Sequence, residues 1–167
     1  GTMERDGIQF VLYRLDYEFN AGTLGIAEGL MFRDACKLAY ERGLPLVTIC
    51  TTAGARQHEN SLSLATMGAT VDYLREYPPL FHVNIYTGNV YGGVPASFAG
   101  VADLQIAVNS PDTHIGFTGP YMVAKSLLAE PKSVGVEDSY AVLPEGTHSA
   151  LRHFEKRNID IMVPSLS

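Results

Sequence analysis

The hydrophobic positions of the chain follow two patterns, short apolar runs and longer stretches with helical spacing. The runs at residues 8–15, 46–50, 81–86 and 104–108 predict strands, because they are rich in β-branched, aromatic and other apolar residues. The runs 46–50 and 104–108 are almost continuously apolar, which is typical of strands buried on both faces of a parallel sheet. Because helical stretches separate the runs, we expect crossover connections and an α/β fold with a mostly parallel sheet.

The remaining segments follow from apolar spacing and from turn residues. Helices are predicted at residues 23–42, between 55 and 77, at 95–101 and at 149–157. A last strand is predicted at 159–163, and the irregular stretch 130–142 predicts a mobile surface loop. The positions expected to be buried on the first two helices are Ile26, Leu30, Ala35, Leu38 and Ala39, and then Leu62, Leu64, Met67, Val71 and Leu74.

Length and composition indicate a single globular domain over residues 1–167. The chain is 46% hydrophobic and 18% charged, which excludes a disordered or collagen-like protein. It has 12 Lys and Arg against 18 Asp and Glu, and the net charge of −6 argues against a nucleic-acid partner.

The cysteines and the first residues favour a cytoplasmic protein. Cys36 and Cys50 form no CxxC, so neither a zinc ribbon nor a disulfide framework is expected, and a reducing compartment follows. Residues 1–6 are charged and lack the apolar stretch of a signal peptide. No window approaches the roughly 18 apolar residues of a membrane-spanning helix, so no membrane association is expected.

Two loops rich in small residues carry the candidate chemistry. Residues 51–55 and 87–93 each follow a predicted buried strand and precede a predicted helix. Backbone N–H groups at such a position, with no side chain in the way, can bind an anion or a developing oxyanion. Gly54-Ala55 and Gly92-Gly93 could each supply one donor, although the same glycines could serve only tight turns.

Other catalytic motifs are missing from the sequence. It contains no GxGxxG, no phosphate-binding GxxxxGK[ST], no GxSxG and no HExxH, so nucleotide, hydrolase and metal sites are not expected. His58 and Glu59 could form an acid–base pair or a solvated helical turn. Arg56 could hold a phosphate or carboxylate, or it could pair with Glu59.

Taken with their flanks, the two loops resemble a known family. Residues 51–59 and 62–64 (TTAGARQHE and LSL) resemble SGGARMQEG and LSL of the carboxyltransferase β subunit of bacterial acetyl-coenzyme A carboxylase. Residues 92–99 (GGVPASFA) and 115–120 (IGFTGP) resemble that family's GGVSASFA and IGFAGP. The resemblance covers nearly the whole chain, because further matches follow the same order at 22–25, 44–47, 143–146 and 159–163.

This resemblance implies a crotonase-like (ClpP/crotonase) fold, a spiral of ββα units. It also implies transfer of a carboxyl group from biotin, bound to a biotin carboxyl carrier protein, to a coenzyme A thioester such as acetyl-CoA. Malonyl-CoA for fatty acid biosynthesis would be the product, and biotin itself would accept the proton. A related α-type carboxyltransferase subunit, absent from this chain, would complete the active site of a hetero- or homo-oligomer.

The family's site residues carry over by position. Two oxyanion holes are implied, one for a thioester enolate and one for the ureido oxygen of biotin. Gly54 and Ala55 would form or flank one donor, and Gly92 and Gly93 the other. The residues expected to bind substrate are Ala53, Arg56, Tyr91, Phe117 and Gly119.

Several departures from the family keep two alternatives open. Ala53 and Asn60 replace glycines of the motif, Pro95 replaces a serine, and the zinc ribbon of bacterial β subunits is missing. The chain therefore could be N-terminally trimmed or naturally minimal. One alternative is a malonyl-type thioester decarboxylase subunit, in which His58 or Tyr91 returns a proton to carbon. The other is an assembly half without catalytic activity.

Overall fold

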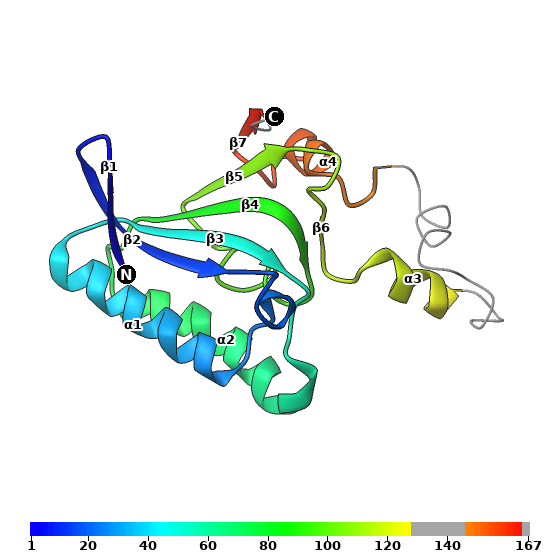
Figure 1. Ribbon diagram of the computed structural model, residues 1–167, viewed down its shortest axis with the longest axis horizontal. Coiled ribbons are helices and arrows are strands. Elements are labelled where there is room, and N and C mark those ends of the chain that lie inside the picture. Colours follow the sequence, from blue (N-terminus) through cyan, green and yellow to red (C-terminus); the bar gives the residue numbers. More distant parts are fainter. Residues whose placement is uncertain (128–145, 165–167) are drawn as a thin grey trace.

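The computed structural model describes residues 1–127 and 146–164 (Figure 1). The strands are β1 (Thr2–Arg5), β2 (Ile8–Leu15), β3 (Leu46–Thr52), β4 (His82–Tyr91), β5 (Leu104–Asn109), β6 (Ile115–Gly116) and β7 (Ile161–Pro164). The helices are α1 (Ile26–Arg42), α2 (Ser61–Arg75), α3 (Pro120–Leu127) and α4 (Ala150–Glu155), with short 3-10 turns at Asn20–Gly22 and Gln57–Glu59. The predicted loop at 130–142 lies outside the described residues.

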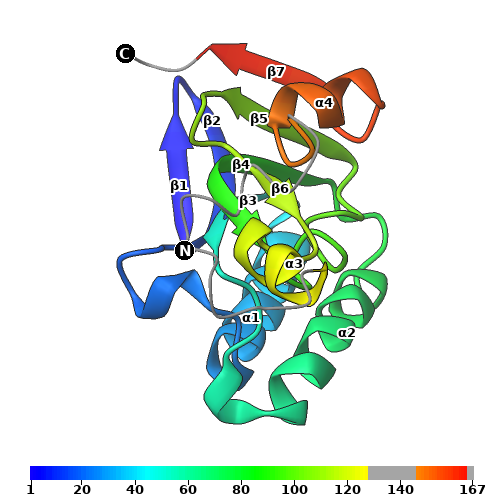
Figure 2. The same cartoon turned by 90° about the vertical axis from the view of Figure 1, so that its right-hand side faces the viewer.

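One sheet organises the described part of the chain, with strand order β1-β2-β3-β4-β5-β7. β1 and β2 pair antiparallel, whereas the pairs from β2 to β7 are parallel, and the short β6 pairs with the end of β4. α1 and α2 lie side by side along one face, and α4 lies beside β5 and β7 (Figures 1 and 2). The predicted α/β class and mostly parallel sheet are confirmed. β1 and α3 were not predicted.

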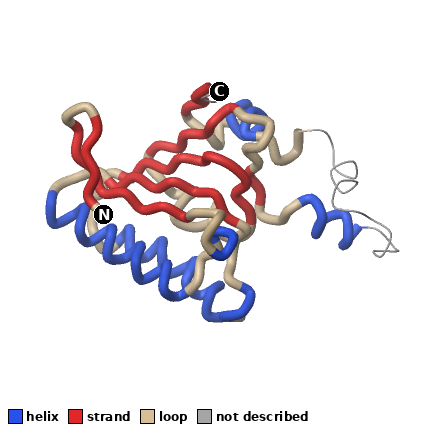
Figure 3. The backbone as a smooth tube through the Cα atoms, in the orientation of Figure 1, coloured by secondary structure: helices blue, strands red, loops and turns tan. Residues whose placement is uncertain are grey.

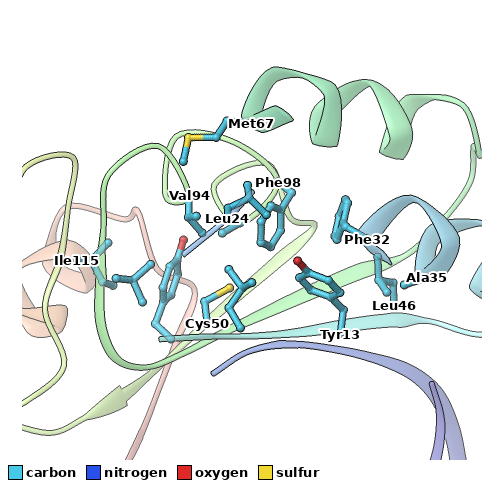
Figure 4. Close-up of a cluster of buried hydrophobic side chains, with 14 of the residues drawn as sticks. Tyr13, Leu24, Phe32, Ala35, Leu46, Cys50, Met67, Val94, Phe98 and Ile115 are labelled. Atoms are coloured by element: carbon cyan, nitrogen blue, oxygen red, sulfur yellow. The ribbon is translucent and has the colours of Figure 1, made fainter. Parts of the chain in front are cut away.

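The two long helices cover one face of the sheet (Figure 3), and both contribute side chains to the hydrophobic core. Tyr13 from β2 meets the ring of Phe32 from α1 edge to face, with centroids 5.2 Å apart. Phe98 packs against both rings, at 4.5 Å from Phe32 and 5.9 Å from Tyr13 (Figure 4). Such aromatic clusters bury a large apolar area, so they fix how the sheet sits against α1.

Phe98 belongs to a segment where the predicted helix at 95–101 is wrong. Residues 92–101 form a succession of turns whose hydrogen bonds span three residues, from Ala96 N to Gly93 O and from Ser97 N to Val94 O. A Cβ on Gly100 would collide with the Pro95 carbonyl oxygen, so only glycine permits this tight path. Apolar residues here pack into the core from an irregular backbone, and their spacing imitates a helix.

The apolar positions of α1 and α2 are only partly buried, contrary to prediction. Ala35, Ala39 and Met67 are buried and Leu38, Val71 and Leu74 partly so. The helices approach each other through small side chains, because a Cβ on Gly29 of α1 would collide with Thr66 of α2. Four of the positions expected to be buried are instead exposed by 40% or more, namely Ile26, Leu30, Leu62 and Leu64.

A polar network crosses the core beneath these helices. Thr48 Oγ1 donates to Asn84 Oδ1 at 2.7 Å and lies 2.9 Å from His82 Nε2, and Cys50 Sγ donates to the same Asn84 oxygen. All four side chains are buried. Desolvation lowers the pKa of His82 to about 4, with Asp103 opposing the shift, so the imidazole is neutral at pH 7.

Acid is therefore expected to destabilise the fold through His82. Unfolded histidine takes up a proton near pH 6.5, whereas folded His82 does so near 4, so the free energy of unfolding falls as pH drops between these values. The slope from this residue is about 1.4 kcal/mol per pH unit. Urea denaturation of the protein and of His82→Gln at pH 7, 6 and 5 measures it. Equal pH dependence in both proteins, or an imidazole titrating near 6.5 by NMR, contradicts the prediction.

None of the helices in the described part of the chain has the length and apolar character that crossing a bilayer requires.

Candidate active site

The two loops predicted to carry the chemistry meet at the carboxyl ends of β3 and β4. Gly54 has a φ of +103° and Gly92 a φ of +77°, both outside the range that side-chain-bearing residues favour. A Cβ on Gly92 would lie 2.7 Å from the Cα of Gly54, and one on Gly54 would lie 2.9 Å from the Cα of Gly92. The backbones are therefore in direct contact, and neither position has room for a side chain.

The backbone amides in these loops divide into occupied and available donors. Gly54 N–H donates to Thr52 Oγ1 at 2.9 Å, and Gly92 N–H donates to the Phe117 carbonyl at 3.0 Å. Ala55 N–H and Gly93 N–H have no acceptor among the residues that the structure describes. Gly54 and Gly92 thus shape the site without offering their own N–H groups, which leaves Ala55 and Gly93 as its candidate donors.

Only one of the two available donors lies at the kind of helix start that was predicted. Ala55 is followed by the Gln57–Glu59 turn and then α2, as expected for a loop that enters a helix. Gly93 instead begins the turns that replace the predicted helix, so no helix dipole supports its N–H. A Cβ on Gly92 would lie 3.5 Å from the Ala55 nitrogen, which places this amide beside the second loop.

An open cavity of about 420 Å³ lies at the first loop. Four of its lining residues, Ala53, Ala55, Arg56 and His58, were candidates from the sequence. The others are Asn20, Thr23 and Gln57. Asn20 and Thr23 were missed because they precede α1, far from both loops in sequence. A hydrogen bond from Ala53 N–H to Ala21 O connects the two segments.

Arg56 is held by carboxylates on the wall of this cavity. Its guanidinium pairs with Glu28 at 2.6 Å and with Glu59 at 3.3 Å, and it donates to the Thr23 carbonyl at 3.0 Å. The hydrogen bond to Glu28 is the main reason that the pKa of Arg56 is raised, with a smaller contribution from Glu59. Pairing with Glu59 was the predicted alternative to anion binding, and Glu28 is a partner that sequence reasoning missed.

Removing the Arg56 charge is expected to destabilise the protein markedly. Arg56→Gln would leave Glu28 and Glu59 without their cation, and all three side chains are less than a quarter exposed. We expect a loss of about 2–3 kcal/mol in unfolding free energy. Urea denaturation measures it, with Arg33→Gln as the control, because Arg33 pairs with Asp34 at an exposed site. Recovery in Arg56→Gln/Glu28→Gln is expected, and a single variant as stable as the control contradicts the interpretation.

Glu59 serves the start of α1 and is unsuited to act with His58 as an acid–base pair. Its carboxylate accepts the Ile26 N–H at 2.6 Å, while Glu28 accepts the Gly25 N–H at 3.1 Å. Both acidic groups therefore stabilise the positive end of this helix. His58 is exposed on the rim of the cavity.

The remaining predicted substrate-binding residues lie beside the second loop. Tyr91 ends β4, and a Cβ on Gly119 would lie 3.9 Å from the Tyr91 ring. Phe117 contributes its carbonyl to Gly92 N–H, whereas its side chain is 71% exposed. The structure therefore brings Tyr91, Phe117 and Gly119 together with Gly92, and their role toward substrate stays a prediction. Within the described residues, no three His, Cys, Asp or Glu side chains are arranged to hold a metal.

Comparison with known proteins gives this arrangement a family. The carboxyl transferase domain family matches residues 1–148. The chloroplastic β subunit of acetyl-coenzyme A carboxylase carboxyl transferase from Cucumis sativus is 32% identical over 98% of this chain. The chain spans only 30% of that relative's length.

Solved structures share the fold. A chain of the Pseudomonas malonate decarboxylase heterodimer superposes with a TM-score of 0.68 at 24% sequence identity. The match covers 95% of this chain and 66% of the decarboxylase chain. Transcarboxylase 12S, crystallised with hydrolysed methylmalonyl-coenzyme A, superposes with a TM-score of 0.76 at 14% sequence identity. That match covers 98% of this chain and 31% of the transcarboxylase chain. These likenesses confirm the crotonase-like α/β fold implied by the motifs. Because the family match covers residues 1–148, most of this chain, the chain belongs to the carboxyl transferase domain family.

Proposed function

We propose that this chain is the β-type part of an acyl-coenzyme A carboxyltransferase of the acetyl-CoA carboxylase type. It would transfer a carboxyl group from carboxybiotin to the α-carbon of the thioester. The observation that carries this proposal is the meeting of two glycine loops with the Ala55 and Gly93 amides still available. Family membership and the relative's name support the reaction class.

The donor set of the site suits an enolate better than a nucleophilic mechanism. Forming a bond at the thioester α-carbon places negative charge on the thioester oxygen, and preorganised N–H groups stabilise such a charge. Ala55 would supply one N–H at the cavity and Gly93 the other at the adjoining loop. The carboxyl group and the proton acceptor would both come from carboxybiotin, so this chain need contribute no general base.

Arg56 would shape the pocket without acting as a free cation. Its positive charge is more than offset by its two carboxylate partners, Glu28 and Glu59. A thioester enolate would therefore depend on the backbone dipoles. Because no free cation at this position holds the negative charge of the carboxyl group, the group could pass from biotin to the thioester.

Two protein partners are part of the proposal, an α-type carboxyltransferase subunit and a biotin carboxyl carrier protein. Exposed Ile26 and Leu30 of α1, with Leu62 and Leu64 of α2, lie near the start of each helix. The turn that lines the cavity, Gln57–Glu59, leads directly into this part of α2. An apolar surface beside an open pocket supports a partner subunit that completes the site.

A malonyl-type decarboxylase is the second candidate, favoured by His58. Loss of carbon dioxide would create the same enolate, which then needs a proton, and His58 lines the cavity beside Ala55. The two reactions separate in one experiment on the complex purified from its native host. Carboxybiotin-dependent formation of a carboxylated acyl-CoA supports the transferase, whereas biotin-independent release of carbon dioxide from malonyl-CoA supports the decarboxylase. A complex with neither activity contradicts both.

A further inference from the structure

The segment Gly116–Gly119 is attached to the second loop by several contacts. β6 pairs with the end of β4 through Tyr91 and Gly116, and Phe117 O accepts the Gly92 N–H. Gly119 lies against the ring of Tyr91. The peptide between Tyr91 and Gly92, which carries this N–H, is therefore held by the segment. The peptide that carries Gly93 N–H follows it directly in the chain.

His148 packs against both this segment and Tyr91. Its ring meets the Tyr91 ring edge to face, with centroids 5.7 Å apart and an interplanar angle of 86°. A Cβ on Gly116 would collide with the imidazole, so the absence of a side chain there allows the close approach. The His148 carbonyl also accepts the Ile115 N–H at 2.7 Å, and the backbone of Thr118 lies close enough to the imidazole to affect its pKa.

Two more histidines, His114 and His153, lie near the contact between His148 and Tyr91. Burial lowers the pKa of His148, and nearby His114 and His153 lower it further, against the opposing effect of the Thr118 backbone. His114 Nδ1 donates to Asn89 Oδ1, and His153 Nε2 donates to the Ile115 carbonyl. The pKa of His153 is also lowered, mainly by burial and partly by Lys156. The neutral form of His148 is therefore the one that fits this environment.

We propose that His148 is a positioning residue, which holds the Gly116–Gly119 segment against Tyr91. It thereby fixes the Tyr91–Gly92 peptide, from which the direction of the adjoining Gly93 N–H is set. The chain of contacts runs from the imidazole to Gly116 and Thr118, then through the Phe117 carbonyl to Gly92 N–H. This arrangement would set the direction in which Gly93 N–H points. The catalytic consequence rests on the proposed function, whereas the structural consequence does not.

Activity of the assembled complex tests the catalytic part. For His148→Ala we expect kcat to fall about 10- to 100-fold with KM little changed, because a misdirected donor weakens transition-state binding. His148→Gln keeps a planar hydrogen-bonding group and should restore most of kcat. In the native complex, protonation of His148 should lower kcat on the acid side, and this acid limb should be weaker in His148→Gln. Unchanged kcat and pH profile in His148→Ala overturn the inference.

Hydrogen exchange at the Gly92 amide tests the structural part without any assay of turnover. Exchange should be faster in His148→Ala and near native in His148→Gln, at unchanged circular dichroism. Equal protection in all three proteins overturns the inference. An inactive wild-type complex with the expected exchange pattern instead contradicts the proposed function alone. If His148→Ala does not fold, the pH profile and exchange of His148→Gln against the wild type decide the question.

Discussion

Replacing Gly92 by alanine is expected to lower turnover at least 100-fold and to reduce the unfolding free energy by about 2–4 kcal/mol. The new Cβ would lie 2.7 Å from the Gly54 Cα, and both atoms belong to the backbone. No side chain can rotate away, so the loops must separate. That separation would move the Ala55 and Gly93 amides apart, and an oxyanion hole tolerates little displacement.

Two other glycines provide matched controls for this substitution. Gly43 has a similar φ of +63° but nothing within 4 Å of its Cβ position, so Gly43→Ala measures backbone strain alone. Gly68 lies within α2 with open space around it, and Gly68→Ala should stabilise the protein by about 0.5–1 kcal/mol. Urea denaturation and turnover of the complex are measured for all three. Full activity in Gly92→Ala would mean that close contact of the loops is unnecessary.

The local sequence was sufficient to place each loop at the carboxyl end of a strand, whereas their contact depends on the strand order that the structure shows. Small residues follow two buried strands, and parallel neighbouring strands bring their carboxyl ends to one edge of the sheet. β3 and β4 are such neighbours, so Gly54 and Gly92 had to lie close together. The fold class follows from the same alternation of strands and helices.

Occupancy of the amides could not be predicted, because it depends on contacts between distant segments. Gly92 N–H is used by Phe117, and Arg56 is held by Glu28, 28 residues earlier in the chain. Nothing in the spacing near either residue indicates these partners. The role of Glu59 at the start of α1 is a similar case, since Ile26 precedes it by 33 residues.

The predicted helix at 95–101 failed for a different reason. Val94, Phe98 and Ala99 are buried, and their spacing suits a helix as well as it suits a compact series of turns. Gly93, Pro95 and Gly100 decide between the two, because they favour turns and Pro95 lacks an N–H donor. This difference affects the candidate site, because Gly93 begins these turns. Its N–H would therefore act as a donor without the support of a helix dipole.

Gly93→Pro is the substitution that addresses this donor directly. Proline has no N–H, so kcat should fall by about 10²- to 10³-fold, the loss typical of removing one donor from an oxyanion hole. The loss should appear in kcat more than in KM, because the charge on the oxygen develops mainly in the transition state. Turnover of the complex is compared at saturating acyl-CoA, with thermal unfolding to confirm that the variant folds.

Packing at the same position needs its own control, because Gly93 lies against Met67. Alanine would keep the N–H, but its Cβ would collide with the Met67 sulfur, which lies above Val94 in the core (Figure 4). Gly93→Ala/Met67→Ala removes that collision and should be about as active as Met67→Ala alone. If the double variant is active and Gly93→Pro is not, the missing N–H explains the loss. If Gly93→Pro folds and keeps full turnover, Gly93 supplies no donor and the enolate must be held elsewhere.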